Sequence, residues 1–233
     1  MPIPVKGLVS KDYLKTRSAM LEVGKKLAVA QSGTPEYDHA LNYADDQSLE
    51  LPSTTHFVIR DAKGNVVSMT ASVENAFGSS LMVDGFLLNN QLTDFSFATH
   101  KNGLPIANVA APGKRPRSSM SPTMILKNGV PYMTIGSPGG SRIIPYVANA
   151  IIGMIDWGMN IQEAINLPHV TNRFGTFALE ANTKAVEYQK GLEALGYDTV
   201  VITLNSGKHG ISIKDGELKG GADPRREGVV IAQ

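Results

Sequence analysis

The residue best placed to act as a nucleophile is Thr54, within Leu51-Pro52-Ser53-Thr54-Thr55-His56-Phe57. A threonine hydroxyl needs a base beside it. One way to supply that base is to make threonine the first residue of a chain, because its own α-amine then accepts the hydroxyl proton. A small residue, Ser53, ahead of a Thr that opens a predicted strand fits such a latent nucleophile, freed when the Ser53–Thr54 bond is cut. The alternative is that Thr54 and Thr55 simply begin a strand, since β-branched residues favour strands.

A Gly-Gly pair in Gly136-Ser137-Pro138-Gly139-Gly140-Ser141-Arg142 is the second candidate. Gly139 and Gly140 fall between a predicted strand and a predicted helix, where exposed backbone N–H groups and the helix dipole favour an anion. That anion could be a phosphate or the oxyanion of acyl transfer. No Gly-Lys-Ser/Thr follows, so the loop is not a P-loop. A plain tight turn is the alternative.

Polar residues at two other strand ends could bind a charged ligand. In Asn89-Asn90-Gln91-Leu92-Thr93-Asp94, Gln91 and Asp94 could recognise an ammonium group, or else cap backbone groups. Ser118 and Ser119 could bind a carboxylate. Their basic neighbours are typical of a solvated loop and receive no role: Lys114, Arg115 and Arg117.

The elements that must position these residues begin at Thr54. Thr54 to Ser72 alternates in polarity around the turn Asp61–Asn65 and predicts a β-hairpin, which would return Ser72 and Glu74 to Thr54. Within it, Thr55, Phe57 and Ile59 are expected to share a face with Val66, Ser68 and Thr70. Further strands are predicted at 86–89, 124–126, 131–135, 199–204, 210–213, 217–219 and 229–232, and helices at 11–29, 143–156, 161–166 and 184–195.

The order of the predicted elements indicates the fold class, and the composition argues against several kinds of partner and chemistry. Strands, then helices, then strands predict an α+β fold with a largely antiparallel sheet covered by helices. The net charge of +1 argues against nucleic acid as a partner, and the absence of Cys excludes disulfides and thiol catalysis. The five histidines lack H-x-x-x-H spacing, so no metal is expected, and no apolar run is long enough to span a membrane. Residues 31–52 read as an exposed linker.

Taken together, the motifs resemble one known family. The residues that carry the resemblance are Thr54-Thr55-His56, Gly64-Asn65, Leu88-Asn89-Asn90-Gln91, Asp94-Phe95, Lys114-Arg115-Pro116, Ser118-Ser119-Met120-Ser121-Pro122-Thr123 and Gly136-Ser137-Pro138-Gly139-Gly140-Ser141-Arg142-Ile143. In this order they resemble the small, catalytic subunit of γ-glutamyltranspeptidase (glutathione hydrolase). Residues 54–233 then correspond to the catalytic small-subunit domain, and residues 1–53 to the tail of the large subunit.

The resemblance implies an N-terminal-nucleophile hydrolase fold, an αββα sandwich, and a precursor that cuts itself between Ser53 and Thr54. It makes Thr54 the nucleophile that attacks a γ-glutamyl amide. The freed α-amine of the same residue would be the base that takes the hydroxyl proton. Gly139 and Gly140 would supply the oxyanion-hole N–H groups. Ser72 stands where the family usually has a second Thr that hydrogen-bonds the nucleophile. The resemblance implies no cofactor.

The same resemblance assigns the substrate-binding residues. Gln91 and Asp94 would hold the substrate α-ammonium, and Ser118 and Ser119 the α-carboxylate. Glu74 stands where many members have Asn near the α-ammonium, a change also found in relatives closer to cephalosporin acylases. The substrate is therefore a γ-glutamyl small molecule or, alternatively, a glutaryl-type amide.

Two further departures shape the expectations. The segment Ser96–Pro112 looks shorter than the family's lid loop and contains no Tyr, which predicts an open acyl site and favours hydrolysis over transfer. The bulk of the large subunit, including an arginine for the substrate carboxylate, is missing, so a large-subunit portion is the expected partner. A truncated, non-catalytic chain is the remaining alternative.

Overall fold

The computed structural model describes residues 3–36, 43–46, 53–173, 175–214 and 216–232. The helices are α1 Val5–Leu8, α2 Lys11–Ser18, α3 Ile143–Ile155, α4 Ile161–Asn166 and α5 Gln189–Ala194, with 3₁₀ turns η1 Gln91–Asp94, η2 Gly140–Arg142 and η3 Lys184–Tyr188. The strands are β1 Thr54–Arg60, β2 Val66–Ser72, β3 Met82–Val83, β4 Phe86–Leu87, β5 His100–Lys101, β6 Leu104–Pro105, β7 Thr123–Lys127, β8 Val130–Gly136, β9 Val170–Asn172, β10 Phe177–Glu180, β11 Thr199–Ile202, β12 His209–Lys214 and β13 Glu217–Ala222.

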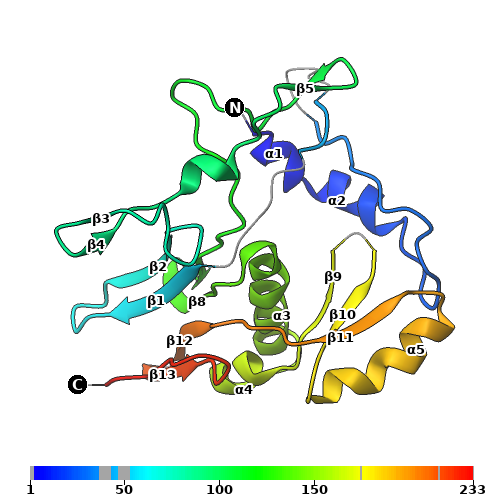
Figure 1. The fold of residues 1–233 in the computed structure, drawn as a ribbon. Helices are drawn as coiled ribbons and strands as arrows, with labels where there is room; N and C mark the ends of the chain where they lie inside the picture. The colour runs from blue at the N-terminus through cyan, green and yellow to red at the C-terminus, as the bar shows by residue number, and fades with distance from the viewer. Residues whose placement is uncertain (1–2, 37–42, 47–52, 174, 215, 233) are drawn as a thin grey trace.

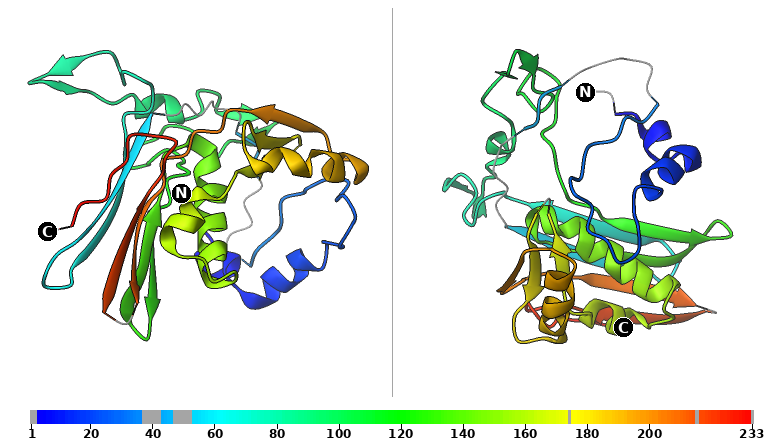
Figure 2. Two further views of the ribbon diagram at one scale, coloured as in Figure 1. Left: turned by 90° about the horizontal axis from the view of Figure 1, so that it is seen from below. Right: turned by 90° about the vertical axis from the view of Figure 1, so that its right-hand side faces the viewer.

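Three layers make up the main body of the molecule (Figures 1 and 2). The hairpin β1–β2 packs against the antiparallel four-stranded sheet β13-β12-β8-β7, and α3 and α4 lie against the other side of that sheet. The left view of Figure 2 shows the hairpin, the sheet and the helices in that order. This arrangement confirms the α+β class and corresponds to three layers of an αββα sandwich. A smaller sheet, β11-β10-β9, lies beside it.

The core lies between the four-stranded sheet and the two helices. It is built from apolar side chains of β8, α3 and α4 that are at most 3% exposed: Met133, Ile135, Ile143, Val147, Ala150, Ile161, Ala164 and Ile165. Asn160 begins α4 with the predicted capping box, because its side chain accepts the Glu163 N–H and the Glu163 carboxylate accepts the Asn160 N–H. Among the described residues, no helix is long and apolar enough to cross a membrane.

The hairpin register corrects one prediction about side-chain faces. Thr55 lies opposite Ala71 and Phe57 opposite Met69, so these residues share a face, and His56 shares the other face with Thr70. The predicted pairing of faces was wrong by one residue, and because side chains alternate, a one-residue slip moves a whole set to the other face. The five-residue turn Asp61–Asn65 sets this register.

His56 lies between the two layers of strands, where the hairpin and the sheet meet. This side chain is 3% exposed, and a Cβ on Gly136 of β8 would lie 2.2 Å from its ring. A glycine is therefore required at 136 for the hairpin to approach the sheet. Burial, with a smaller contribution from His209, lowers the pKa of His56 to about 4. Burial lowers the pKa of His169, which is 1% exposed, to about 2.

These two histidines predict a loss of stability on mild acidification. Below its unfolded pKa of about 6.5 each ring takes up a proton in the unfolded chain but stays neutral when folded, so unfolding is favoured as pH falls from 6.5 towards 4. At pH 5 the loss is about 2 kcal/mol for each residue. Urea unfolding at pH 7 and pH 5 should show it, and His56→Gln should remove about half of the difference. An unchanged pH dependence in that variant would contradict the prediction.

Several predicted boundaries were wrong. The helix predicted over residues 11–29 ends at Ser18, because beyond it Leu21 and Val23 are 69% and 102% exposed and have no core to pack against. Residues 229–232 form no strand. The strands β9 and β10 were missed, and β10 pairs in parallel with β11. The predicted linker 31–52 lies partly outside the described residues, but Ala44 N–H donates to Pro105 O at 2.9 Å.

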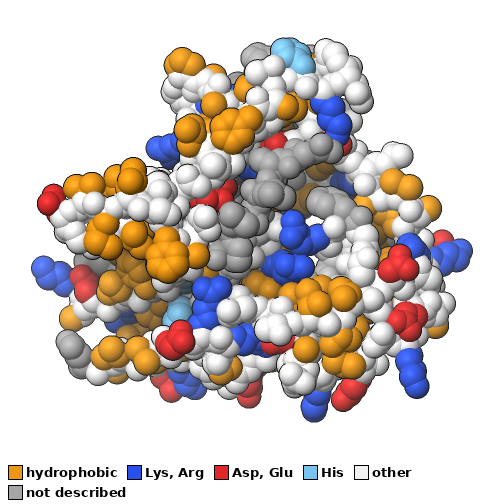
Figure 3. Space-filling view, viewed as in Figure 1, with side chains coloured by type: hydrophobic (Ala, Val, Ile, Leu, Met, Phe, Trp, Pro, Cys, Tyr) orange, Lys and Arg blue, Asp and Glu red, His pale blue; other side chains and the backbone are white. Residues whose placement is uncertain are grey.

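The outward face of β1–β2 carries uncovered apolar side chains. Phe57, Ile59, Val67 and Met69 are between 39% and 54% exposed, and no helix of the described ranges packs on them. Figure 3 shows hydrophobic atoms gathered over this part of the molecule. A two-stranded hairpin with one bare apolar face is marginal by itself, so this face fits a further covering layer.

Candidate active site

Thr54 opens β1 directly opposite Ser72, the last residue of β2. The Thr54 hydroxyl donates to Ser72 Oγ at 3.1 Å, and Ser72 Oγ donates to the Ser53 carbonyl at 3.1 Å. Ser72 Oγ also accepts the Glu74 N–H at 3.0 Å. All three bonding positions of this hydroxyl are thus used, which holds it rigidly between the predicted nucleophile and the bond predicted to be cut.

The Ser53 carbonyl has a second donor, because Val73 N–H reaches it at 3.3 Å. Two donors on one carbonyl oxygen are the arrangement that stabilises the negative charge of a tetrahedral intermediate. A hydroxyl attack by Thr54 on Ser53 places its charge on this oxygen. The hairpin ends therefore contain both the attacking group and the charge-stabilising groups for the predicted cleavage.

The hydroxyl of Ser72 is expected to accelerate cleavage of the Ser53–Thr54 bond. Ser72→Ala is expected to slow cleavage of the Ser53–Thr54 bond by about 10²-fold, because loss of one oxyanion donor typically costs that much in rate. Ser72→Thr keeps the hydroxyl and should stay within about tenfold of wild type. The appearance of the cleaved chain in a denaturing gel time course measures both rates. Equal slowing in the two variants would show that the hydroxyl is not what matters.

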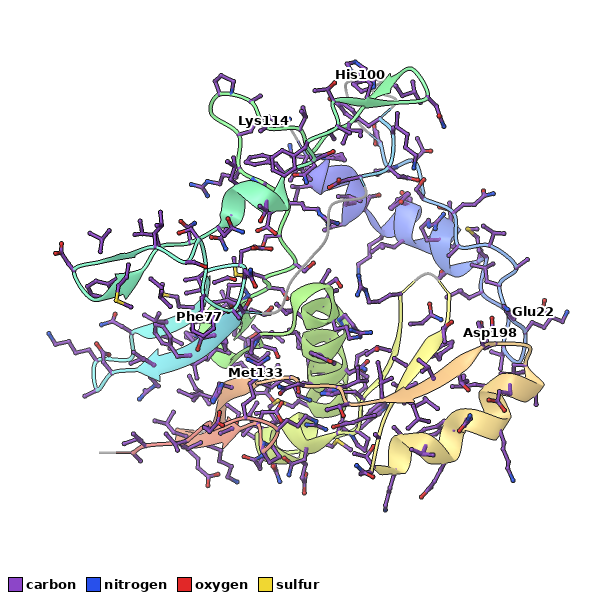
Figure 4. The ribbon with its side chains drawn as sticks, viewed as in Figure 1. Glu22, Phe77, His100, Lys114, Met133 and Asp198 are labelled. Carbon is purple, nitrogen blue, oxygen red and sulfur yellow. The ribbon has the colours of Figure 1, made fainter. Side chains whose placement is uncertain are left out.

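A pocket beside Thr54 collects nearly all the site residues predicted from the sequence. Its lining comes from the hairpin ends, η1, the loop before β7 and the start of α3: Thr54, Ser72, Glu74, Gln91, Asp94, Arg117, Ser118, Ser119, Met120, Gly140 and Ile143. No member of the segment Ser96–Pro112 contributes to this lining. His100 of that segment, labelled in Figure 4, lies at the edge of the molecule away from β1.

One wall of the pocket is rich in hydrogen-bond acceptors. Glu74 is 3% exposed and accepts Asn90 Nδ2 at 2.9 Å, and Asp94 lies on η1. Gln91 Nε2 donates to the Ser72 carbonyl at 3.2 Å, while its buried Oε1 has no donor among the described residues. A buried acceptor without a partner is unfavourable until a donor arrives. This wall is suited to an ammonium group.

The loop before β7 contributes donors to the same pocket, and its residues are called the donor wall below. Ser118 and Ser119 line it together with Arg117, whose backbone N–H donates to Asn108 and whose Nε lies 3.2 Å from Asp46 Oδ2. The sequence reasoning left Arg117 without a role, although its place next to Ser118 was the available signal. A guanidinium and two hydroxyls match a carboxylate. The pocket therefore combines acceptors from the hairpin end and η1 with donors from the loop before β7.

The Gly-Gly pair lies between two cavities. Gly140, with φ 58°, lines both the pocket beside Thr54 and the adjacent cavity, whereas Gly139, with φ 137°, lines only the adjacent cavity. A Cβ on Gly139 would lie 2.8 Å from the Tyr146 ring, so a side chain there meets both a strained backbone and a packed ring. Both N–H groups lack acceptors among the described residues and stand just before α3. They remain the predicted oxyanion donors for the substrate.

Two residues that sequence reasoning missed support this site. Arg226 donates to the Thr54 carbonyl at 3.4 Å and to Asn205, so it ties the C-terminal segment to the start of β1. Asn90 donates to the Glu74 carboxylate and so orients it, although Asn90 does not line the pocket. Glu74 itself has a φ of 74°, a left-handed conformation that Asn adopts more readily than Glu. Among the described residues no cluster of His, Asp and Glu could hold a metal.

The layered fold, with Thr54 opening the first strand of the hairpin, is that of the N-terminal-nucleophile hydrolase class. The family model for γ-glutamyltranspeptidase matches residues 1–233, so the chain belongs to the γ-glutamyltranspeptidase family.

The relatives agree with this membership. The glutathione hydrolase proenzyme of Bacillus subtilis (strain 168) is 35% identical over 98% of this chain. The acylase ACY 1 proenzyme of Pseudomonas sp. (strain SE83) is 34% identical over 99% of it. A solved structure of Helicobacter pylori γ-glutamyltranspeptidase, a point mutant, superposes with a TM-score of 0.66 at 36% identity, over 74% of this chain and all of that one. The chain spans 40% and 38% of the length of the two curated relatives.

Proposed function

We propose that this chain is the catalytic part of a γ-glutamyl hydrolase/transferase that works through an N-terminal threonine. The observation that carries the proposal is the pocket next to Thr54, whose lining combines an acceptor wall with a donor wall. Its acceptor wall suits an ammonium and its donor wall suits a carboxylate, which are the two groups at the head of a γ-glutamyl residue. The curated relatives named glutathione hydrolase support the same substrate class.

The first step is self-cleavage between Ser53 and Thr54. The Thr54 hydroxyl attacks the Ser53 carbonyl carbon, and the developing oxyanion is held by the donors on that oxygen, Ser72 Oγ and Val73 N–H. As the C–N bond breaks, the proton lost by the hydroxyl passes to the leaving nitrogen, so that Thr54 gains a free α-amine and an ester to Ser53, which water hydrolyses. The products are a chain ending at Ser53 and a chain beginning at Thr54.

The second step is acyl transfer on the new N-terminus. The Thr54 amine takes the hydroxyl proton as Oγ1 attacks the substrate γ-carbonyl carbon, and the amine then returns a proton to the leaving nitrogen. Gly139 and Gly140 are proposed to stabilise the oxyanion. Gln91, Asp94 and Glu74 bind the ammonium, and Ser118 and Ser119 bind the carboxylate. Water then releases glutamate, and the absence of residues 96–112 from the pocket lining supports hydrolysis over transfer to an amino acid.

The complete enzyme is proposed to need a further, large-subunit portion. The curated relatives are proenzymes much longer than this chain, and the outward apolar face of β1–β2 has the character of a surface that another layer covers. We assign residues 1–53 to the tail of that portion and residues 54–233 to the catalytic domain. Asp46, on that tail, contacts Asn108 Nδ2 at 2.6 Å and Arg117 at 3.2 Å.

A second candidate is an acylase for glutaryl-type side chains. It is favoured by Glu74, by the open pocket and by the acylase ACY 1 relative. A glutaryl group carries the carboxylate but lacks the ammonium, and it would leave Gln91 Oε1 unpaired. A chain without catalysis, acting only through its apolar faces, is the third reading.

One comparison of substrates tests all three. The chain, assembled with the large-subunit portion, is assayed with a γ-glutamyl anilide and a glutaryl anilide. The proposal expects kcat/KM at least tenfold higher for the γ-glutamyl compound. A preference for the glutaryl compound would support the acylase, and no turnover of either by a well-folded, cleaved complex would support the non-catalytic reading.

A further inference from the structure

A second cavity lies beside the oxyanion loop, and arginines dominate it. Its lining includes Gly139 and Gly140, Tyr146 and Leu204, and three arginines from separate segments, Arg142, Arg173 and Arg226. Its lining contains no Asp or Glu. Cationic groups gathered around one hollow repel one another unless an anion neutralises them.

The Arg142 guanidinium has a buried N–H group that lacks a hydrogen-bond acceptor among the described residues. This group is its Nε–H, and Arg173 forms no ion pair with the described residues. The carboxylates that interact electrostatically with nearby Tyr146 are Glu180 and Asp223, and both are bound by Arg225. A buried guanidinium N–H without an acceptor carries a desolvation penalty that a carboxylate would remove.

We propose that this cavity receives a carboxylate side chain of the large-subunit portion and that Arg142, Arg173 and Arg226 hold it. A permanent protein carboxylate fits better than a passing substrate, since a substrate that leaves would expose the same buried N–H in every turnover. The chain spans 40% of the Bacillus subtilis relative, so most of such a protein is available to supply the group. The inference rests on the proposed large-subunit partner and not on the γ-glutamyl specificity.

The position of the cavity gives the contact a consequence for catalysis. Gly140 lines both this cavity and the pocket beside Thr54, and Arg226 also contacts the Thr54 carbonyl. A carboxylate bound to Arg142 therefore fixes the loop that presents the oxyanion donors. Assembly with the large-subunit portion would then complete the oxyanion loop as well as cover the apolar face of the hairpin.

The test measures assembly rather than activity. The chain in its Thr54→Ala form is titrated with the purified large-subunit portion, and the dissociation constant is measured at 50 mM and 500 mM NaCl. Arg142→Gln is expected to weaken binding at least tenfold at low salt, and Arg142→Gln with Arg173→Gln still further, with a smaller effect at high salt. Arg115→Gln, an exposed arginine that lines neither cavity, is the matched control and should change binding less than twofold.

A parallel arm distinguishes a bound small anion from a protein carboxylate. Sodium sulfate is added to the chain alone and thermal unfolding is followed. Protection by sulfate that disappears in Arg142→Gln, together with unchanged binding of the large-subunit portion, would mean that the cavity holds a free anion and would overturn the docking proposal. Equal binding by Arg142→Gln and Arg115→Gln, or no binding by the parent chain, would overturn it as well. Failure of γ-glutamyl turnover with intact, arginine-dependent assembly would instead contradict only the proposed function.

Discussion

Replacing Thr54 by alanine is expected to abolish cleavage of the Ser53–Thr54 bond and all amide turnover. The alanine chain has no hydroxyl to attack Ser53, while the donors on that carbonyl stay in place. Loss of a nucleophile that acts in both steps should reduce each rate by about 10⁴-fold or more. Intact mass and N-terminal sequencing after incubation measure the cut, because wild type should yield a new chain that begins with Thr54.

Thr54→Ser is the matched control for this experiment. It keeps the hydroxyl and the freed amine and should still be cut, at a reduced rate. A wild-type chain that stays whole on its own but is cut when assembled would show that the large-subunit portion completes the site. Cleavage of Thr54→Ala at the wild-type rate would refute the mechanism.

Removing the Asp94 carboxylate is expected to erase the preference for γ-glutamyl substrates. Asp94 lies on the acceptor wall with Glu74 and Gln91, and a buried charged contact to a ligand is worth about 2–5 kcal/mol. Asp94→Ala should therefore lower kcat/KM for a γ-glutamyl anilide by about 10²-fold or more. Turnover of a glutaryl anilide, which has no ammonium, should change less than threefold.

Asp198→Ala provides the control, since Asp198 is exposed and lies far from the pocket, as its label in Figure 4 shows. Its kinetics should match wild type for both substrates. If Asp94→Ala lowered the two substrates equally, Asp94 would be shaping the pocket and not binding the ammonium. That result would support the acylase function, because it would give no evidence that the acceptor wall binds an ammonium group.

Local signals in the sequence were sufficient for the elements that depend on neighbours in the chain. Asn128-Gly129 predicted the β7–β8 hairpin because both residues accept positive φ, and they adopt 54° and 81°. Asn160 with Glu163 predicted the start of α4 because a capping box forms within one turn. The series of motifs from Thr54 onward was specific enough to indicate the family, since several consecutive motifs occur in its order.

Packing over long distances in the chain was not available to the same reasoning. The helix predicted over 11–29 had an apolar stripe but no surface to bury it, and it stopped at Ser18. The apolar pattern of β10 is too short to predict a strand, and this segment forms one only by pairing with β9 and β11. The faces of the β1–β2 hairpin depended on a register that the turn geometry sets.

The sequence by itself identified the candidates for the chemistry: Thr54 with Ser72, the Gly-Gly loop, and the two groups of polar residues around Asp94 and Ser118. The tertiary structure alone decided how they face one another. It put Arg117 on the donor wall, brought Arg226 from the far end of the chain to the Thr54 carbonyl, and gathered three arginines around one cavity. The physical reason is that residue type and spacing encode local conformation and reactivity, whereas charge complementarity across a pocket arises only when distant segments pack together.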